Sequence, residues 1–183
     1  DMCQSSNFAQ QGYDNGVAMG GDLNNEDYNG EAPKFAVSAL MDAGVESYPG
    51  TSLQRIQMIK VWEEGGESLE KVFDIAGGAT DASVDLDTCL PTGSGYSNLC
   101  TVWQDPEFEA TENAAYYARV LENDSCRYSK RQCNTELQKQ GLTCGDITPG
   151  HELYGCCDGK VPDTIKELSL ISISEPTRPA QIS

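Results

Sequence analysis

Cations and histidine are scarce in this 183-residue sequence. Lys and Arg total 12 against 29 Asp and Glu, which gives a formal net charge of −17, and His151 is the single histidine. Because phosphate recognition depends on clustered Lys and Arg, this composition excludes nucleic acid as a partner. Anionic membrane surfaces are disfavoured for the same reason, and a strongly acidic, solvent-facing surface is expected instead.

Complete catalytic motifs are missing as well. His151 lies in TPGHELYG without a second histidine to form a metal pair, and there is neither a G-x-S-x-G motif nor a set of paired C-x-x-C motifs. We read His151 as a surface residue. The sequence therefore predicts no catalytic, cofactor-binding or metal-binding residue and no cofactor in this chain, and it leaves open whether the chain is part of an enzyme.

Long apolar runs and a signal peptide are also lacking, so no membrane partner is expected. The chain opens at Asp1 rather than Met, within what reads as a loop. If the protein is secreted, we expect its N-terminus to have been cut away, either by processing or by truncation of the gene.

Cysteine, by contrast, is abundant. Eight cysteines at loop-like spacings favour structural disulfides over redox-active thiols, and hence a periplasmic or extracellular location. The candidates for disulfide bonds are Cys89, Cys100, Cys126, Cys133, Cys144, Cys156 and Cys157. Cys89 and Cys100 could close the loop between them. Because a vicinal disulfide is strained, Cys156 and Cys157 are expected to bond to two different upstream partners. The spacing leaves the remaining connectivity open.

Short strand patterns separated by turn signals predict a mainly β fold, a β-sandwich-like region with a loop-rich, disulfide-stapled C-terminal region. Alternation or β-branched and aromatic enrichment marks strands at residues 34–41, 53–62, 69–75, 83–86, 100–103 and 114–122. Residues 53–62 predict a central strand, and the GGE turn makes 69–75 its hairpin partner. Residues 135–140 predict a short helix with Asn134 as its N-cap and Gly141 as its terminator.

The segment AAYYARVLE, residues 114–122, has the composition of a strand buried on both faces. Arg119, its one cation, then needs a partner. We predict a structural ion pair with Glu122 or Asp105. A contact between Arg119 and a ligand is the alternative.

Two acidic clusters resemble cation sites only superficially. Counted from Asp22, an EF-hand loop needs Gly at its sixth position and Glu at its twelfth, but Asp27 and Pro33 stand there. An irregular calcium site in this loop is the alternative to a plain acidic loop. Asp81, Asp85 and Asp87 are interpreted as a solvated face.

Several segments resemble the C-terminal part of a bacterial family, the domain of unknown function 3604. They run in the family's order: GVAMGGDL at 16–23, LQRIQMIKVW at 53–62, EKVFDIA at 70–76, VWQDPEFEA at 102–110 and AAYYARVLENDSCRYSKRQCN at 114–134. The resemblance covers roughly residues 16–167, and its most specific part is YYARVLE followed by Cys-Arg-aromatic-Ser.

The resemblance implies a longer parent protein. The N-terminal portion of the family is similar to metal-dependent hydrolases of the polymerase and histidinol phosphatase type, whose ligands lie in His-rich motifs. Those motifs are absent from this sequence. A divalent metal is therefore expected in the missing domain and not in this chain.

A second resemblance concerns residues 168–183. Where the family continues into an apolar, Trp-containing close, LSLISISEPTR resembles the translation of a sequencing-library transposase adapter, with Ser172 where His is expected. We expect a non-native tail, and an ordinary polar tail is the alternative.

These observations divide the chain into a truncated lead-in (1–15), a β-sandwich-like region (16–125), a cysteine-rich region (126–167) and the tail (168–183). The first hypothesis is a non-catalytic C-terminal fragment that packs against its own missing N-terminal domain, the catalytic part of a metallohydrolase-like protein. The second is a free-standing secreted module that binds carbohydrate or calcium. The second hypothesis predicts an exposed aromatic patch, for instance with Trp62, Trp103 and Tyr96.

Overall fold

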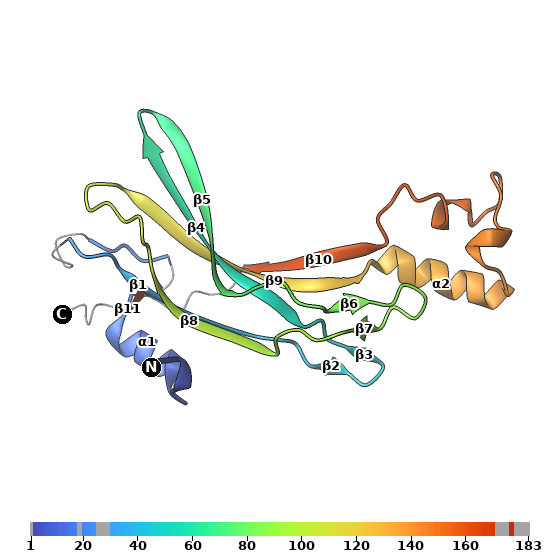
Figure 1. Ribbon diagram of the computed structural model, residues 1–183, viewed down its shortest axis with the longest axis horizontal. Coiled ribbons are helices and arrows are strands. Elements are labelled where there is room, and N and C mark those ends of the chain that lie inside the picture. Colours follow the sequence, from blue (N-terminus) through green and yellow to red (C-terminus); the bar gives the residue numbers. More distant parts are fainter. Residues whose placement is uncertain (1, 18–19, 25–29, 171–175, 178–183) are drawn as a thin grey trace.

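The computed structural model describes residues 2–17, 20–24, 30–170 and 176–177, and the described chain is mainly β. Two antiparallel sheets dominate it (Figure 1). The larger has the order β10-β9-β4-β5, with bounds Thr164–Leu170, Ala114–Cys126, Leu53–Glu64 and Glu67–Gly77. The smaller has the order β11-β1-β8, with bounds Pro176–Thr177, Lys34–Leu40 and Asn98–Gln104.

The core lies between these two sheets, because alternate side chains of each strand point inward. Phe35 and Val37 of β1 pack in one cluster with Ile56 and Met58 of β4 and with Val120 of β9. Apolar faces from both sheets thus meet in a single core, and the mainly β, sandwich-like prediction is confirmed.

The predicted hairpin is also confirmed. β4 lies between β9 and β5, and its turn to β5 is made by Gly65 and Gly66, whose φ angles are 63° and 85°. Positive φ at both central residues is the requirement of a tight hairpin turn, which glycine meets without strain. Among the described strands, none pairs with β5 on its other side, so β5 forms a free edge of the sheet.

β9 is not buried on both faces, which corrects the prediction for residues 114–122. Ala118 and Val120 are buried, whereas Tyr117, which precedes Ala118 and so points to the opposite face, is 38% exposed. The physical reason is that only one face of the larger sheet packs against the smaller sheet.

The predicted helix at 135–140 is only the second half of α2, Tyr128–Gln140, which begins directly after β9. Asn134 is therefore not an N-cap. It lies inside the helix and its Nδ2 donates to the carbonyl oxygens of Leu86 and Asp87, at 2.7 and 3.0 Å. Gly141 does end the helix in the left-handed conformation, as predicted. A further helix, α1 at Phe8–Asn15, comes from residues in which the sequence showed no periodicity.

The remaining elements are short. They are η1 (Met2–Gln4), β2 (Gly44–Val45), β3 (Tyr48–Pro49), β6 (Ser83–Val84), β7 (Pro91–Thr92), η3 (Cys144–Asp146) and η4 (Tyr154–Cys156). No helix among the described residues is long and apolar enough to cross a membrane.

Four disulfides join Cys3 to Cys100, Cys89 to Cys126, Cys133 to Cys156 and Cys144 to Cys157. The predicted Cys89–Cys100 loop closure is wrong. Cys89 reaches the end of β9, while Cys100, on β8, faces the N-terminal segment and its Cys3, which was not among the candidates. Cys156 and Cys157 bond to two different upstream cysteines, so no vicinal disulfide forms.

Candidate functional site

Two hollows adjoin each other where β9 passes into α2, and together we call them the α2 groove. The first, of about 590 Å³, is lined by Thr51, Glu122, Ser125, Cys126, Arg127, Tyr128, Ser129, Arg131, Ile165 and Glu167. The second, of about 860 Å³, is lined by Tyr48, Tyr128, Ser129, Arg131, Gln132, Cys133, Thr135, Glu136 and Cys156. Because Tyr128, Ser129 and Arg131 line both hollows, the two hollows lie side by side at the start of the helix.

Local structure fixes this junction. The backbone N–H of Arg127 donates to the carbonyl oxygen of Asp163 at 2.9 Å, and the chain turns from strand into helix at that residue. Cys126 is tied to Cys89, and Cys133 to Cys156. Three of these cysteines line the groove, so disulfides hold its walls in place.

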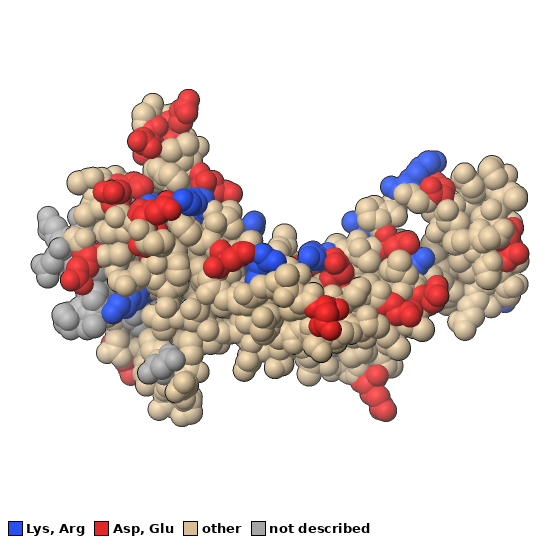
Figure 2. Space-filling model, viewed as in Figure 1, with Lys and Arg blue, Asp and Glu red and all other residues tan. Residues whose placement is uncertain are grey.

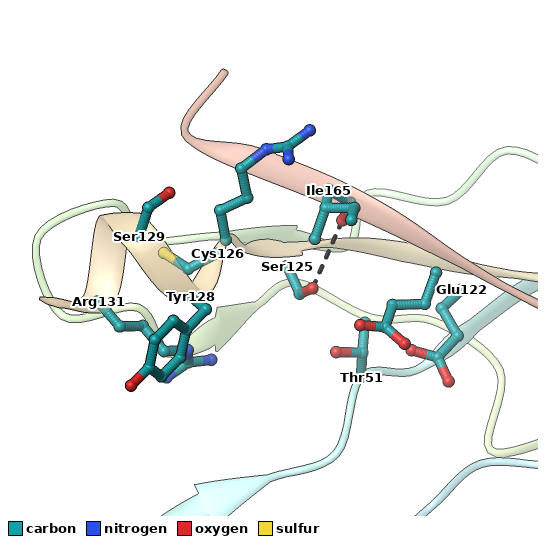
Figure 3. Close-up of a pocket in the computed structure, with 10 residues that line it drawn as sticks. Thr51, Glu122, Ser125, Cys126, Tyr128, Ser129, Arg131 and Ile165 are labelled. Atoms are coloured by element: carbon teal, nitrogen blue, oxygen red, sulfur yellow. Dashed lines mark hydrogen bonds between the residues drawn. The ribbon is translucent and has the colours of Figure 1, made fainter. Parts of the chain in front are cut away.

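The middle of the groove is aromatic and basic. Tyr48 and Tyr128 are 63% and 75% exposed, and the guanidinium carbon of Arg131 lies 5.6 Å from the centre of the Tyr48 ring. Tyr128 and Arg131 are three residues apart on α2 and so share a face of the helix. Figure 3 shows both at the start of the helix. They offer a stacking surface next to a cation.

The arginines of the groove have no acidic partner: none of the ion pairs formed within the described part of the chain includes Arg127 or Arg131. Arg127 Nε is buried and donates a hydrogen bond to no described residue. Figure 2 shows how widely Asp and Glu are spread over one face of the molecule. The groove thus holds two arginines that form no ion pair within the described residues.

The other end of the groove is acidic. Glu122 lies near Thr51, away from Tyr128 and Arg131 (Figure 3). Burial raises the pKa of Glu122, and the nearby carboxylates of Glu167 and Asp42 raise it further. The groove thus has a cationic, aromatic middle and a carboxylate end whose charge is costly to keep.

Arg119 does not form the predicted ion pair. Its Nε donates to Gln57 Oε1 at 2.7 Å, and Gln57 Nε2 donates to Asp74 Oδ1 at 2.7 Å. Arg55 completes this row at 2.5 Å from Asp74. The register of the sheet explains why Arg119 binds Gln57: Arg119 of β9 lies opposite Gln57 of β4, and Gln57 lies opposite Asp74 of β5.

Asp105, the other predicted partner of Arg119, instead binds Lys60. Lys60 Nζ lies 3.1 Å from Asp105 and 3.0 Å from Glu112, and Lys60 and Asp105 are 3% and 4% exposed. The hydroxyl of Tyr116 donates a hydrogen bond to Asp105 Oδ2 at 2.7 Å. Burial alone lowers the pKa of Lys60, but its hydrogen bonds to Glu112 and Asp105 outweigh burial and raise it. This network closes one end of the core and is structural.

The aromatic residues suggested for a binding patch do not form one. Trp103 packs in the core, with its ring centre 5.8 Å from that of Phe35 and 5.1 Å from that of Phe73. Trp62 is half-buried, with Lys60 Nζ 5.1 Å from its ring centre, and Tyr96 pairs by its backbone with Leu53.

The acidic clusters have other roles. Asp85 Oδ1 accepts hydrogen bonds from the backbone of Asp87 and from Thr88, and the bonds from Thr88 are the main cause of its lowered pKa. Asp81 accepts the N–H of Ser94 at 3.0 Å. Asp81, Asp85 and Asp87 are all exposed, which agrees with a solvated face, and the carboxylates of Asp81 and Asp85 also cap turns. The loop from Asp22 to Asp27 lies partly outside the described residues.

His151 is half-buried, and its Nδ1 accepts the N–H of Leu153 at 3.1 Å, so it stabilises a turn. Among the described residues, no group of three His, Cys, Asp or Glu side chains is placed to hold a metal ion.

Sequence reasoning missed Tyr48, Tyr128 and Arg131. Tyr128 lies in the Cys-Arg-aromatic-Ser segment and Arg131 follows two residues after that segment, so a helix starting at Tyr128 would have placed both on one face. Tyr48 comes from the distant β2–β3 hairpin, and no local pattern signals that it reaches α2.

Comparison with known proteins gives one family. The family described as "Protein of unknown function (DUF3604)" matches residues 1–143, so the match begins before the expected boundary at 16 and ends before 167. No match was found among curated proteins or among solved structures.

Proposed function

The chain belongs to the DUF3604 family, and on that basis we propose that it is the non-catalytic C-terminal region of a longer, secreted or periplasmic protein. Its missing N-terminal portion resembles a metal-dependent hydrolase and would hold the divalent metal. The role of this chain is then to pack against that portion and shape the entrance to its active site. The four disulfides support an oxidising compartment.

The observation that carries this proposal is a set of exposed apolar side chains next to the groove. Leu40, Val45 and Tyr48 are 78%, 61% and 63% exposed, and they lie at the end of β1 and on the β2–β3 hairpin. Apolar side chains gathered on a protruding hairpin are typical of an interaction surface. A neighbouring domain would bury them.

The gene provides the test. Sequencing the source DNA outward from both ends should show, in the same reading frame, an upstream region with His-rich metal motifs. The N-terminal portion expressed with this chain should then form a stable complex, which Val45→Lys weakens. Lys160→Glu, at a 78% exposed side chain distant in sequence, is the matched control. A complex unaffected by Val45→Lys would contradict packing through the hairpin.

Residues 168–183 are proposed to be a non-native tail. The family match ends at residue 143, upstream of it, and the LSLISISEPTR string resembles adapter sequence. The same DNA decides this point. Genomic DNA that encodes an apolar, Trp-containing close in place of Leu168 onward supports the proposal, and genomic LSLISISEPTR contradicts it.

The second candidate is a free-standing binding module. The exposed pair Tyr48 and Tyr128 in the α2 groove favours it, because exposed aromatic rings that line a hollow are typical of ligand sites. A signal peptide encoded directly before Asp1 would favour this candidate over the first.

A further inference from the structure

The middle of the α2 groove has the chemistry of an anion site. Arg131 lines both hollows and forms no ion pair within the described residues. The first turn of α2 contains no acidic residue, and its N-cap makes no side-chain hydrogen bond. The helix dipole therefore adds to the positive potential around Arg131.

Carboxylates near the groove do not cancel this potential. Glu136, which lines the second hollow, is paired with Lys139 at 2.7 Å. Glu122 and Glu167 line the first hollow only. Glu122 lies at the end away from Arg131 (Figure 3), and Glu167 is close enough to Glu122 to raise its pKa. The acidic charge elsewhere on the chain is screened over about 8–10 Å at ordinary ionic strength.

The shape and lining of the groove indicate the rest of the ligand. Tyr48 and Tyr128 present apolar ring faces with a hydroxyl at one end. The second hollow is also lined by Ser129, Gln132 and Thr135, whose side chains can donate and accept hydrogen bonds. Gln132 donates to the Tyr128 hydroxyl and Thr135 donates to the carbonyl oxygen of Arg131. A saccharide has matching groups, since its rings have apolar C–H faces and hydroxyl edges. Two adjoining open hollows also suit an extended chain better than a compact ligand.

We propose that the α2 groove binds a negatively charged saccharide chain, with Arg131 binding its carboxylate or sulfate groups and Tyr48 and Tyr128 stacking on its sugar rings. Arg131 already lies against the Tyr48 ring, so its planar guanidinium is held in place before the ligand arrives. This inference rests on the second candidate function, because a domain packed on the β2–β3 hairpin would bury Tyr48.

The test is calorimetric titration of the whole chain with matched saccharides. A short oligogalacturonate carries carboxylates, and its methyl ester has the same backbone without the charge. A heparin-derived oligosaccharide carries sulfates and distinguishes the two anionic groups. We expect binding of at least one charged saccharide and at least tenfold weaker binding of the neutral ester.

Variants locate the site. Arg131→Ala should weaken binding by about tenfold, and Arg131→Lys should restore part of it because the charge returns without the planar fork. Tyr48→Ala should weaken binding of every saccharide that binds. Lys160→Ala removes one cation from a residue that lines neither hollow, and should leave binding unchanged. Thermal unfolding of each variant checks that the fold is retained.

Several outcomes would overturn the inference. They are equal affinity for the charged saccharide and its methyl ester, equal loss in Arg131→Ala and Lys160→Ala, and absence of measurable binding to any saccharide. Binding of poly-glutamate as tight as that of oligogalacturonate would show an acidic peptide site instead.

Discussion

At the scale of single residues, the buried charges are the feature whose loss is expected to destabilise the fold most. Lys60, Asp105 and Glu112 form their network in a place where water is largely excluded. Such a network contributes little net stability relative to apolar residues, but breaking it leaves an uncompensated charge. The stability of the fold therefore depends on keeping all of its members.

Lys60→Met is expected to lower the free energy of unfolding by about 3–5 kcal/mol, because it leaves the Asp105 carboxylate buried without a cation. Urea unfolding measures it. Lys71→Met breaks the ion pair with Glu107, whose side chains are 42% and 55% exposed, and should cost at most about 1 kcal/mol. Equal losses in the two variants would contradict the structural role of Lys60.

Glu122 should make stability depend on pH. Since its pKa is raised in the folded state, the native protein holds this proton more tightly than the unfolded chain does. Stability then falls as the pH rises from the ordinary value of 4.5 through the raised pKa, and the penalty persists above it. Glu122→Gln should raise stability at neutral pH and flatten this dependence. Denaturant melts across that pH range test it, with Glu46→Gln, an exposed carboxylate, as the control.

Residue roles were predicted only where they depend on the chain nearby. Gly141 could be assigned as a helix terminator because a positive φ is a local requirement. The partner of Arg119 could not, because it depends on which residue lies opposite across β4. The register between neighbouring strands is set by the whole sheet, so it cannot be predicted from the composition of one strand.

At the scale of elements, the β4–β5 hairpin could be predicted because the strand patterns on either side and the Gly-Gly turn between them all indicate a hairpin. β9 was misread because enrichment in Tyr, Val and Leu does not tell a strand buried on one face from a strand buried on two. The α2 groove was missed because it joins α2 to the β2–β3 hairpin, which is far away in sequence.

Two glycines of the hairpin provide a matched prediction. Gly65 and Gly77 have φ angles of 63° and 75°, so alanine is strained at both. A Cβ at Gly65 meets open space, whereas a Cβ at Gly77 would lie 2.5 Å from the carbonyl oxygen of Gln54. Gly65→Ala should cost about 1 kcal/mol and Gly77→Ala clearly more. Thermal unfolding compares them, and equal costs would contradict the close approach at the end of β5.

At the scale of the whole molecule, the disulfides differ in how much chain they restrain. Cys3–Cys100 spans 97 residues and Cys144–Cys157 spans 13. In the chain-entropy account, removing the disulfide that closes the long loop lowers the free energy of unfolding by about 4–5 kcal/mol, and removing the one that closes the short loop lowers it by about 3 kcal/mol. Double Cys→Ser variants, compared by urea unfolding, test this order. A larger loss from the short loop would show that local structure around α2, rather than chain entropy, depends on the bond.

The free edge of β5 has a consequence for solubility. An unpaired strand edge invites another copy of the chain to add its own strand. Along β5 the exposed positions include Glu67, Glu70 and Asp74, so two such edges repel each other at neutral pH. Exchanging all three carboxylates for amides would remove this repulsion while the backbone groups remain available. The acidic composition thus keeps the molecules apart, and the triple amide variant should aggregate edge to edge.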